Sequence, residues 1–202
     1  MTTLENNQDK FNKLREEYPV FIYKNFSYEY NEDTLSLILD FHFECGEHQF
    51  HPKIEICASE LFKTPKVDLE DISIIAFNIG MIELISYWKA FACPKVMVET
   101  CILTQGQIEF WKKIYFNGLG EYFYLNSIET NINDFMTIES KGIPFNKLEF
   151  KQEGNEDKVI VPIGGGKDSV VTLELLRNNG FEVIPMIINP RGATISCMEV
   201  GG

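Results

Sequence analysis

Three consecutive glycines, followed by a lysine, an aspartate and a serine, carry the clearest chemical signature in this sequence: Gly164-Gly165-Gly166-Lys167-Asp168-Ser169. Glycine admits positive φ angles and lets another group approach the main chain closely. Where such a turn leads into a helix, free amides and the helix dipole point to one spot and favour an anion. The run therefore predicts a phosphate-binding loop in preference to an ordinary tight turn capped by Asp168 or Ser169.

Two familiar phosphate loops do not fit this run. The GxxxxGK[ST] pattern would require a glycine at Val161 and a serine or threonine at Asp168. The GxGxxG pattern would require a glycine at Ser169. The run instead resembles the SGGxDS loop of the PP-loop (N-type ATP pyrophosphatase) superfamily, with Gly164 in place of the first serine. Members of that superfamily cleave ATP between its α- and β-phosphates and adenylate a substrate group.

The elements around the loop are expected to form one βαβ unit. A strand over residues 158–163, a helix over 168–178 and a strand over 182–188 follow one another, with a turn at Asn179-Gly180. Both strands are almost wholly apolar, which is typical of parallel strands covered on both faces. The predicted fold class is thus α/β, with the first βαβ unit of a doubly wound parallel (HUP/PP-loop, Rossmann-like) sheet.

Only 33 residues follow Ser169, whereas a sheet of this kind needs more than about 100 residues. We therefore expect residues 151–202 to be the start of an ATP-binding domain, in a chain that looks like an N-terminal fragment. The apolar strand Val183–Ile188 would then be an exposed edge, open to homo-oligomerisation or aggregation.

The upstream residues, 1–150, are expected to form an N-terminal α+β domain. Residues 19–58 are rich in aromatic and β-branched residues, alternate in polarity and turn at Gly46, which predicts antiparallel strands. The polar residues 1–18 are frayed or helical, and the polar stretch 129–158 is the predicted domain boundary.

Two main helices are expected in this domain. A largely apolar helix over 70–91 ends before Pro94, and a short strand over 95–100 follows it. An amphipathic helix over 104–116 begins at Thr104, with Gln107 completing a capping box. Residues 117–120 break that helix, and the pattern of residues 121–128 is compatible with a buried strand or with another helical turn.

The charge and cysteine content exclude several classes of function. The 202 residues hold 30 acidic and 18 basic side chains, a net charge of -12, which argues against a nucleic-acid partner because such binding depends on Lys and Arg. No apolar run reaches the ~20 residues of a membrane span, and the polar N-terminus is not a secretory signal. Five cysteines without a CxxC pair favour a reducing, cytoplasmic location.

The three histidines, His42, His48 and His51, lie close together in sequence. Alternation places His42 on the polar face of a half-exposed strand, opposite two phenylalanines. No recognisable ligand spacing accompanies the cluster, so solvated histidines on a strand pair are preferred to a metal site.

Three runs carry a narrower resemblance: VPIGGGKDSVVTLELL (161–176), FNIGMIELISYWKAFACPKV (77–96) and FWKKIYFNGLGEYFYLN (110–126). They are similar to the UDP-N-acetylmuramoyl-L-alanyl-L-glutamate epimerase family over about residues 20–202. The resemblance implies inversion of the terminal L-glutamate of UDP-MurNAc-L-Ala-L-Glu to D-glutamate, with ATP and Mg²⁺, in peptidoglycan synthesis. Adenylation explains the need for ATP, because the α-proton is far more acidic beside an acyl adenylate than beside a carboxylate.

The resemblance assigns the glycine-rich run to ATP. The phosphates would be held by Gly164, Gly165, Gly166, Lys167 and Ser169. Asp168 would orient the loop or a Mg²⁺ ion. The adenine would lie near Ile187–Asn189.

The residue that moves the proton is not identified by the sequence. The candidates in the upstream domain are Glu83, Tyr87, Lys89 and Glu121, with Lys113 and Asn117 as further polar residues. Glu83 and Tyr87 are four residues apart and share a helix face, where a purely structural hydrogen bond between them is the alternative.

Two other functions remain open at this point. The first is another adenylating PP-loop ligase or a tRNA-modifying enzyme, although tRNA thiolation is disfavoured by the single downstream Cys197 and the acidic charge. The second is a nucleotide-binding fragment without catalysis.

Overall fold

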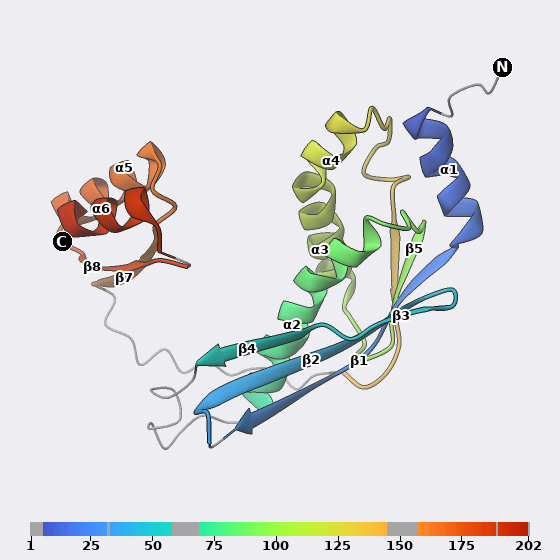
Figure 1. Cartoon of the computed structure of the whole chain (residues 1–202), viewed down its shortest axis with the longest axis horizontal. Coiled ribbons are helices and arrows are strands. Elements are labelled where there is room, and N and C mark those ends of the chain that lie inside the picture. Colours follow the sequence, from blue (N-terminus) through green and yellow to red (C-terminus); the bar gives the residue numbers. More distant parts are fainter. Residues whose placement is uncertain (1–5, 32, 58–68, 145–156, 189, 202) are drawn as a thin grey trace. The chain divides into compact units, whose positions relative to one another are not determined.

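The computed structural model describes residues 6–31, 33–57, 69–144, 157–188 and 190–201 (Figure 1). The chain divides into two compact units, residues 1–148 and 149–202. Each unit has its own core of buried apolar side chains.

The first unit is built on a six-stranded mixed sheet. Its strands are β1 (Val20–Asn31), β2 (Ser36–Cys45), β3 (His48–Phe50), β4 (Lys53–Cys57), β5 (Lys95–Val98) and β6 (Thr137–Ser140). β1 and β2 are antiparallel, and β3 and β4 both pair with the outer edge of β2. The predicted antiparallel strands are therefore confirmed, and Gly46 turns the chain with φ +57°.

Two parallel strands extend this sheet on the other side. β5 pairs with β1, and β6 pairs with β5, so the strand order is β3-β2-β1-β5-β6. β5 was expected from its sequence, but β6 lies in the stretch that we interpreted as a polar boundary. Its residue Ile138 is buried, and the preceding Phe135 and Met136 are completely buried, which explains why this short strand belongs to the core.

A β-bulge in β1 determines which side chains face the core. Phe21 and Tyr23 are buried before the bulge, whereas Phe26 and Tyr28 pack against the core after it. The register shifts between Tyr23 and Asn25, at Lys24. The inserted residue reverses the alternation, because successive residues of a strand point to opposite faces.

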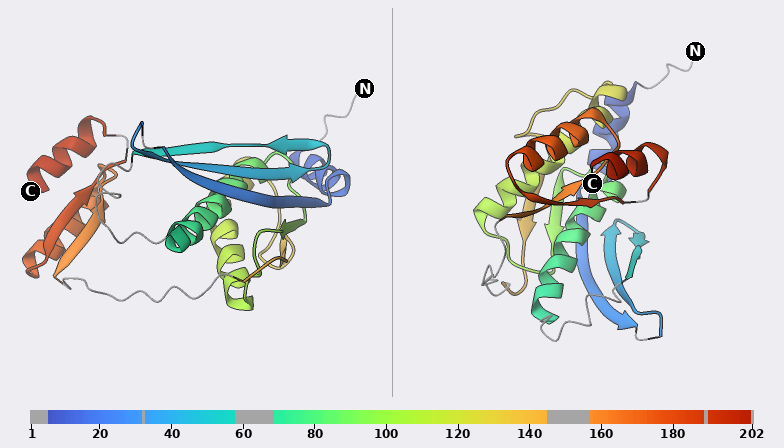
Figure 2. Two further views of the ribbon diagram at one scale, coloured as in Figure 1. Left: turned by 90° about the horizontal axis from the view of Figure 1, so that it is seen from below. Right: turned by 90° about the vertical axis from the view of Figure 1, so that its left-hand side faces the viewer.

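The described residues of this unit form four helices: α1 (Asn7–Glu17), α2 (Leu69–Trp88), α3 (Gln105–Gly118) and α4 (Gly120–Leu125). α2 packs against β1 and β2, and α3 packs against β6 (Figure 2). The capping box of Thr104 and Gln107 is present, as predicted. Residues 117–120 interrupt the helix only at Leu119, and the segment after them is helical rather than a strand.

The second unit contains β7 (Lys158–Pro162), α5 (Lys167–Asn178), β8 (Glu182–Met186) and α6 (Gly192–Gly201). β7 and β8 pair in parallel, which confirms the predicted βαβ unit. α6 was not expected from the sequence. Val161, Ile163 and Leu173 form the core of this unit.

The described residues of the second unit cover only one face of this small sheet. Ile160 is 61 % exposed, and Ile184 and Met186 lie exposed on the same face. The expectation of strands covered on both faces is therefore wrong for the described residues, because the side chains that pack on the sheet all lie on its other face. Within the described part of the chain, the outer edge of β8 has no partner strand.

Candidate functional site

The glycine-rich loop leaves the carboxyl end of β7 and enters α5. Gly165 has φ +79°, a left-handed conformation that favours glycine. Gly166 is the N-cap of α5 and provides no side-chain cap. The alternative that we considered less favourable, a tight turn capped by Asp168 or Ser169, is not what the structure has, because the helix already begins at Lys167.

Ser169 instead closes the loop on itself. Its hydroxyl oxygen accepts a hydrogen bond from the Gly164 amide at 3.1 Å. No hydrogen bond joins the amides of Gly165 or Gly166 to another described residue. These two amides and those of the first turn of α5 therefore remain available to an anion, at the positive end of the helix dipole.

One side of the glycine-rich loop is open, and its other side lies close to α6. A Cβ on Gly164 or Gly166 would meet no atom within 4 Å. A Cβ on Gly165 would lie 3.1 Å from the backbone nitrogen of Thr194, at the start of α6. The open side of the loop is thus free for a ligand, while its other side packs on α6.

The charged residues of the loop lie in the first turn of α5. Lys167 and Asp168 are both exposed, and the Asp168 carbonyl accepts a hydrogen bond from the Thr172 hydroxyl at 2.8 Å. One carboxylate beside a phosphate site is the usual protein share in Mg²⁺ binding, where phosphates and water supply the other ligands. The described residues contain no cluster of three or more His, Cys, Asp or Glu side chains arranged to hold a metal by themselves.

The candidate proton-transfer residues of the first unit lie in two regions: on α2 itself, and around the end of α2 and the start of α4. The Tyr87 ring contacts Phe43 and Phe50 at centroid distances of 5.7 and 5.0 Å, so Tyr87 faces β2 and β3. Glu83 is half-buried in the same helix. No hydrogen bond joins Glu83 to Tyr87 in the described structure.

Lys89, directly after α2, and Glu121, in the first turn of α4, are both exposed. The Tyr122 hydroxyl donates a hydrogen bond to the Lys89 carbonyl at 3.2 Å, which holds the start of α4 against the end of α2. Lys113 and Asn117 are exposed on α3.

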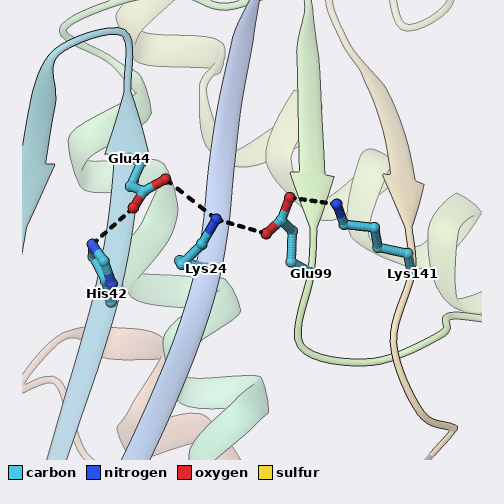
Figure 3. A network of polar contacts seen from close by, with 5 residues as sticks. All are labelled: Lys24, His42, Glu44, Glu99 and Lys141. Atoms are coloured by element: carbon cyan, nitrogen blue, oxygen red, sulfur yellow. Dashed lines mark ion pairs between the residues drawn. The ribbon is translucent and has the colours of Figure 1, made fainter.

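A chain of ion pairs, missed in the sequence, crosses the sheet of the first unit (Figure 3). Glu99 contacts Lys141 at 2.7 Å and Lys24 at 3.0 Å, and Lys24 also contacts Glu44 at 3.7 Å. Hydrogen bonding to Lys141 and then to Lys24 lowers the pKa of Glu99, and hydrogen bonding to Glu99 raises the pKa of Lys24. Lys24 and Glu44 lie on β1 and β2, and Glu99 and Lys141 directly follow β5 and β6. Only strand pairing therefore reveals the network.

His42 and His51 lie on the same face as this network, whereas His48 pairs with the buried Cys45 and lies on the opposite face. His42 Nε2 lies 3.2 Å from Glu44 Oε1, and the His42 ring stacks on His51 at a centroid distance of 4.3 Å. The His48 ring contacts Phe91 at a centroid distance of 5.2 Å. These contacts agree with a structural interpretation of the three side chains.

The comparison with protein families gives the decisive observation. A family model described as the MurL N-terminal domain matches residues 12–202. The chain belongs to the MurL N-terminal domain family.

Relatives of this MurL N-terminal domain carry a functional name. The chain is 30 % identical over 119 residues to a protein of Micromonospora sp., covering 58 % of this chain and 26 % of that relative. It is 28 % identical over 148 residues to a protein of Salinispora tropica, covering 72 % and 31 %. Both relatives are named UDP-N-acetyl-alpha-D-muramoyl-L-alanyl-L-glutamate epimerase.

A protein of Xanthomonas oryzae pv. oryzae with the same name is 26 % identical over 124 residues, covering 61 % of this chain and 27 % of that relative. The aligned part of the chain thus spans less than a third of the length of these three relatives. No solved structure matches the chain. None of the helices in the described segments is both long and apolar enough to cross a membrane.

The residues matched by the MurL family model include both compact units. The glycine-rich loop and the upstream sheet are therefore parts of one family pattern.

Proposed function

We propose that this protein takes part in the ATP-dependent epimerisation of the terminal L-glutamate of UDP-MurNAc-L-Ala-L-Glu, a step of peptidoglycan synthesis. One observation carries the proposal. A glycine-rich loop with open backbone amides stands at the helix start of a βαβ unit, in a chain whose family relatives are named epimerases of this dipeptide.

In the proposed site, the loop binds the phosphates of ATP. The amides of Gly165, Gly166 and the first turn of α5 donate to phosphate oxygens. Ser169 keeps its hydroxyl proton available to a phosphate while its oxygen accepts from Gly164. Lys167 adds positive charge, and Asp168 would share a Mg²⁺ ion with the phosphates.

ATP supplies the activation that the chemistry needs. An oxygen of the glutamate α-carboxylate attacks the α-phosphorus, pyrophosphate leaves, and an acyl adenylate forms. The carbonyl of this mixed anhydride stabilises an enolate, so a base of ordinary strength can remove the α-proton. A proton is then delivered to the opposite face, and water releases AMP from the D-product.

The proton transfers are assigned to the upstream candidates. Glu83 and Tyr87 are half-buried on α2, where a carboxylate or phenol can be shielded from water. Lys89 and Glu121 offer an exposed base and an exposed acid beside the contact of Tyr122 with the Lys89 carbonyl. Replacing Glu83 by Gln, Lys89 by Met or Glu121 by Gln in separate variants distinguishes the two places.

The test follows two products in one reaction. The chain is incubated with UDP-MurNAc-L-Ala-L-Glu, ATP and Mg²⁺ in D₂O, and AMP, glutamate chirality and α-deuterium are measured. D-Glutamate that carries deuterium and appears with AMP supports the proposal. AMP without D-glutamate contradicts epimerisation and indicates another adenylating enzyme. The absence of AMP contradicts adenylation by this chain.

The loop assignment has its own matched pair of variants. Asp168→Ala should abolish AMP formation, because it removes the carboxylate beside the phosphates. Glu174→Ala, an exposed acid farther along α5, should leave AMP formation unchanged. Equal rates for both variants would contradict the assignment of the loop to ATP.

A further inference from the structure

We propose that Arg191, at the start of α6, is a second cationic phosphate ligand of the glycine-rich loop, and that Thr194 positions it. The inference rests on the proposed binding of ATP phosphates at this loop. Arg191 and Thr194 lie 22 or more positions after Ser169 in the chain, and no phosphate-loop pattern contains them.

The first observation is the close packing of α6 on the loop. From the position of a Cβ on Gly165, the Thr194 nitrogen and Cγ2 both lie 3.1 Å away, and the Ala193 carbonyl carbon lies 3.2 Å away. A side chain on Gly165 would need the space that α6 occupies. The first turn of α6 is therefore a wall of the loop, and Arg191 directly precedes that turn.

The second observation is the way Thr194 holds Arg191. The Thr194 hydroxyl accepts a hydrogen bond from the Arg191 amide at 2.9 Å and donates one to the Arg191 carbonyl at 2.6 Å. The Thr194 amide also donates to the Arg191 carbonyl at 2.8 Å. Thr194 thus fills, with its methyl group, the space that a side chain on Gly165 would need, and it holds the backbone of Arg191 through its hydroxyl.

The third observation is the distribution of charge in this unit. Lys158 is paired with Glu182 at 2.8 Å, and Arg177 lies in the last turn of α5, at the far end from the loop. Neither Lys167 nor Arg191 forms an ion pair with a described acidic residue. The described cations without an acidic partner near the loop are thus Lys167 and Arg191.

An arginine is well suited to this place. The guanidinium presents several donors in a planar fork that matches phosphate oxygens in pairs, and it stays charged at any physiological pH. Two cations around one loop match the charge of a triphosphate or of a pyrophosphate better than that of AMP.

Binding measurements test the role of Arg191. Dissociation constants of the 202-residue chain for ATP, pyrophosphate and AMP are measured by calorimetry. Arg191→Ala should weaken ATP and pyrophosphate binding roughly tenfold to a hundredfold, the usual loss for a charge-assisted hydrogen bond, and should affect AMP less. Arg191→Lys should lose only part of the affinity. Arg177→Ala, the matched control, should bind ATP like the wild type.

A double-variant cycle separates positioning by Thr194 from a merely structural effect. Thr194→Val keeps the methyl group beside Gly165 but removes both hydroxyl hydrogen bonds to Arg191. Thr194→Val should weaken ATP binding in the wild-type background and have little further effect in the Arg191→Ala background. Thr194→Ser, which keeps the hydroxyl, should bind ATP like the wild type. Equal losses in both backgrounds would contradict positioning.

The outcomes distinguish this inference from the proposed function. If the wild type binds ATP and pyrophosphate and Arg191→Ala binds them equally well, the inference is wrong and the loop assignment stands. If the wild type binds neither, the phosphate loop itself is wrong, and the inference is overturned with it.

Discussion

Gly80 of α2 and Tyr23 of β1 pack against each other without room for a side chain on the helix. A Cβ on Gly80 would overlap the Tyr23 hydroxyl and would lie 2.8 Å from Phe41 Cδ1. Both aromatic residues are completely buried. This contact explains a glycine in the middle of an apolar helix, where glycine costs about 1 kcal/mol relative to alanine.

Replacing Gly80 by alanine should therefore destabilise the protein. We expect a loss of about 1–3 kcal/mol in the free energy of unfolding, because the added methyl group forces β1 and α2 apart. Gly106→Ala is the control, since a Cβ there meets no atom within 4 Å, and it should be neutral or stabilising. Urea unfolding measures both, and a neutral Gly80→Ala would contradict the packing of Tyr23 on α2.

Removing the hydroxyl group should change the free energy of unfolding differently at the two buried tyrosines, Tyr23 and Tyr115. The Tyr23 hydroxyl has no hydrogen-bond partner among the described residues, whereas the Tyr115 hydroxyl donates to the Met81 carbonyl at 2.6 Å. Tyr115→Phe should lower the free energy of unfolding by about 1 kcal/mol, and Tyr23→Phe should leave it unchanged or raise it. Equal losses in urea unfolding would contradict this difference.

The same two residues predict a loss of stability at alkaline pH. Burial raises the pKa of both Tyr23 and Tyr115. Above about pH 10 these tyrosines ionise in the unfolded state but remain neutral in the folded state. The free energy of unfolding should therefore fall as the pH rises beyond that value, and the fall should be less steep in the Tyr23→Phe, Tyr115→Phe double variant.

The lowered pKa of Glu99 predicts that the free energy of unfolding also falls as the pH becomes acidic. Lys141 and Lys24 lower its pKa, so its stabilising effect is complete above about pH 4.3, the unfolded value, and is lost as the pH falls through the folded pKa. Glu99→Gln should be less stable than the wild type at pH 7 but equal to it in strong acid. Glu139→Gln, which removes a single ion pair with Lys95, should have a smaller effect in pH-dependent thermal unfolding.

The glycines of the loop should differ in their tolerance of alanine. Gly165→Ala should destabilise the second unit by about 1–3 kcal/mol, because the backbone has positive φ and the methyl group meets Thr194. Gly166→Ala has ordinary backbone angles and open space, so it should fold normally. Hydrogen exchange of α5 and α6 measures the difference, and similar exchange in both variants would contradict the close packing.

Local signals allowed much of the fold to be predicted. The alternation of β2, the capping box at Thr104 and the strand–glycine–helix pattern around Gly165 depend on neighbours in sequence, so each appears in a window of a few residues. Other features depend on distant residues. β6 was missed because its pairing with β5 is tertiary, and α6 was missed because the apolar residues of its short sequence form no clear stripe.

The sequence by itself determined the βαβ unit and the place of the glycine-rich turn inside it, since glycine conformation and helix boundaries are local properties. The tertiary structure decided which residues pack against the loop and which ion pairs cross the sheet. Thr194 meets Gly165 only because α6 folds back on α5, and Glu99 meets Lys24 only because parallel strands place them side by side. Such contacts depend on packing between segments far apart in the chain, which local spacing does not encode.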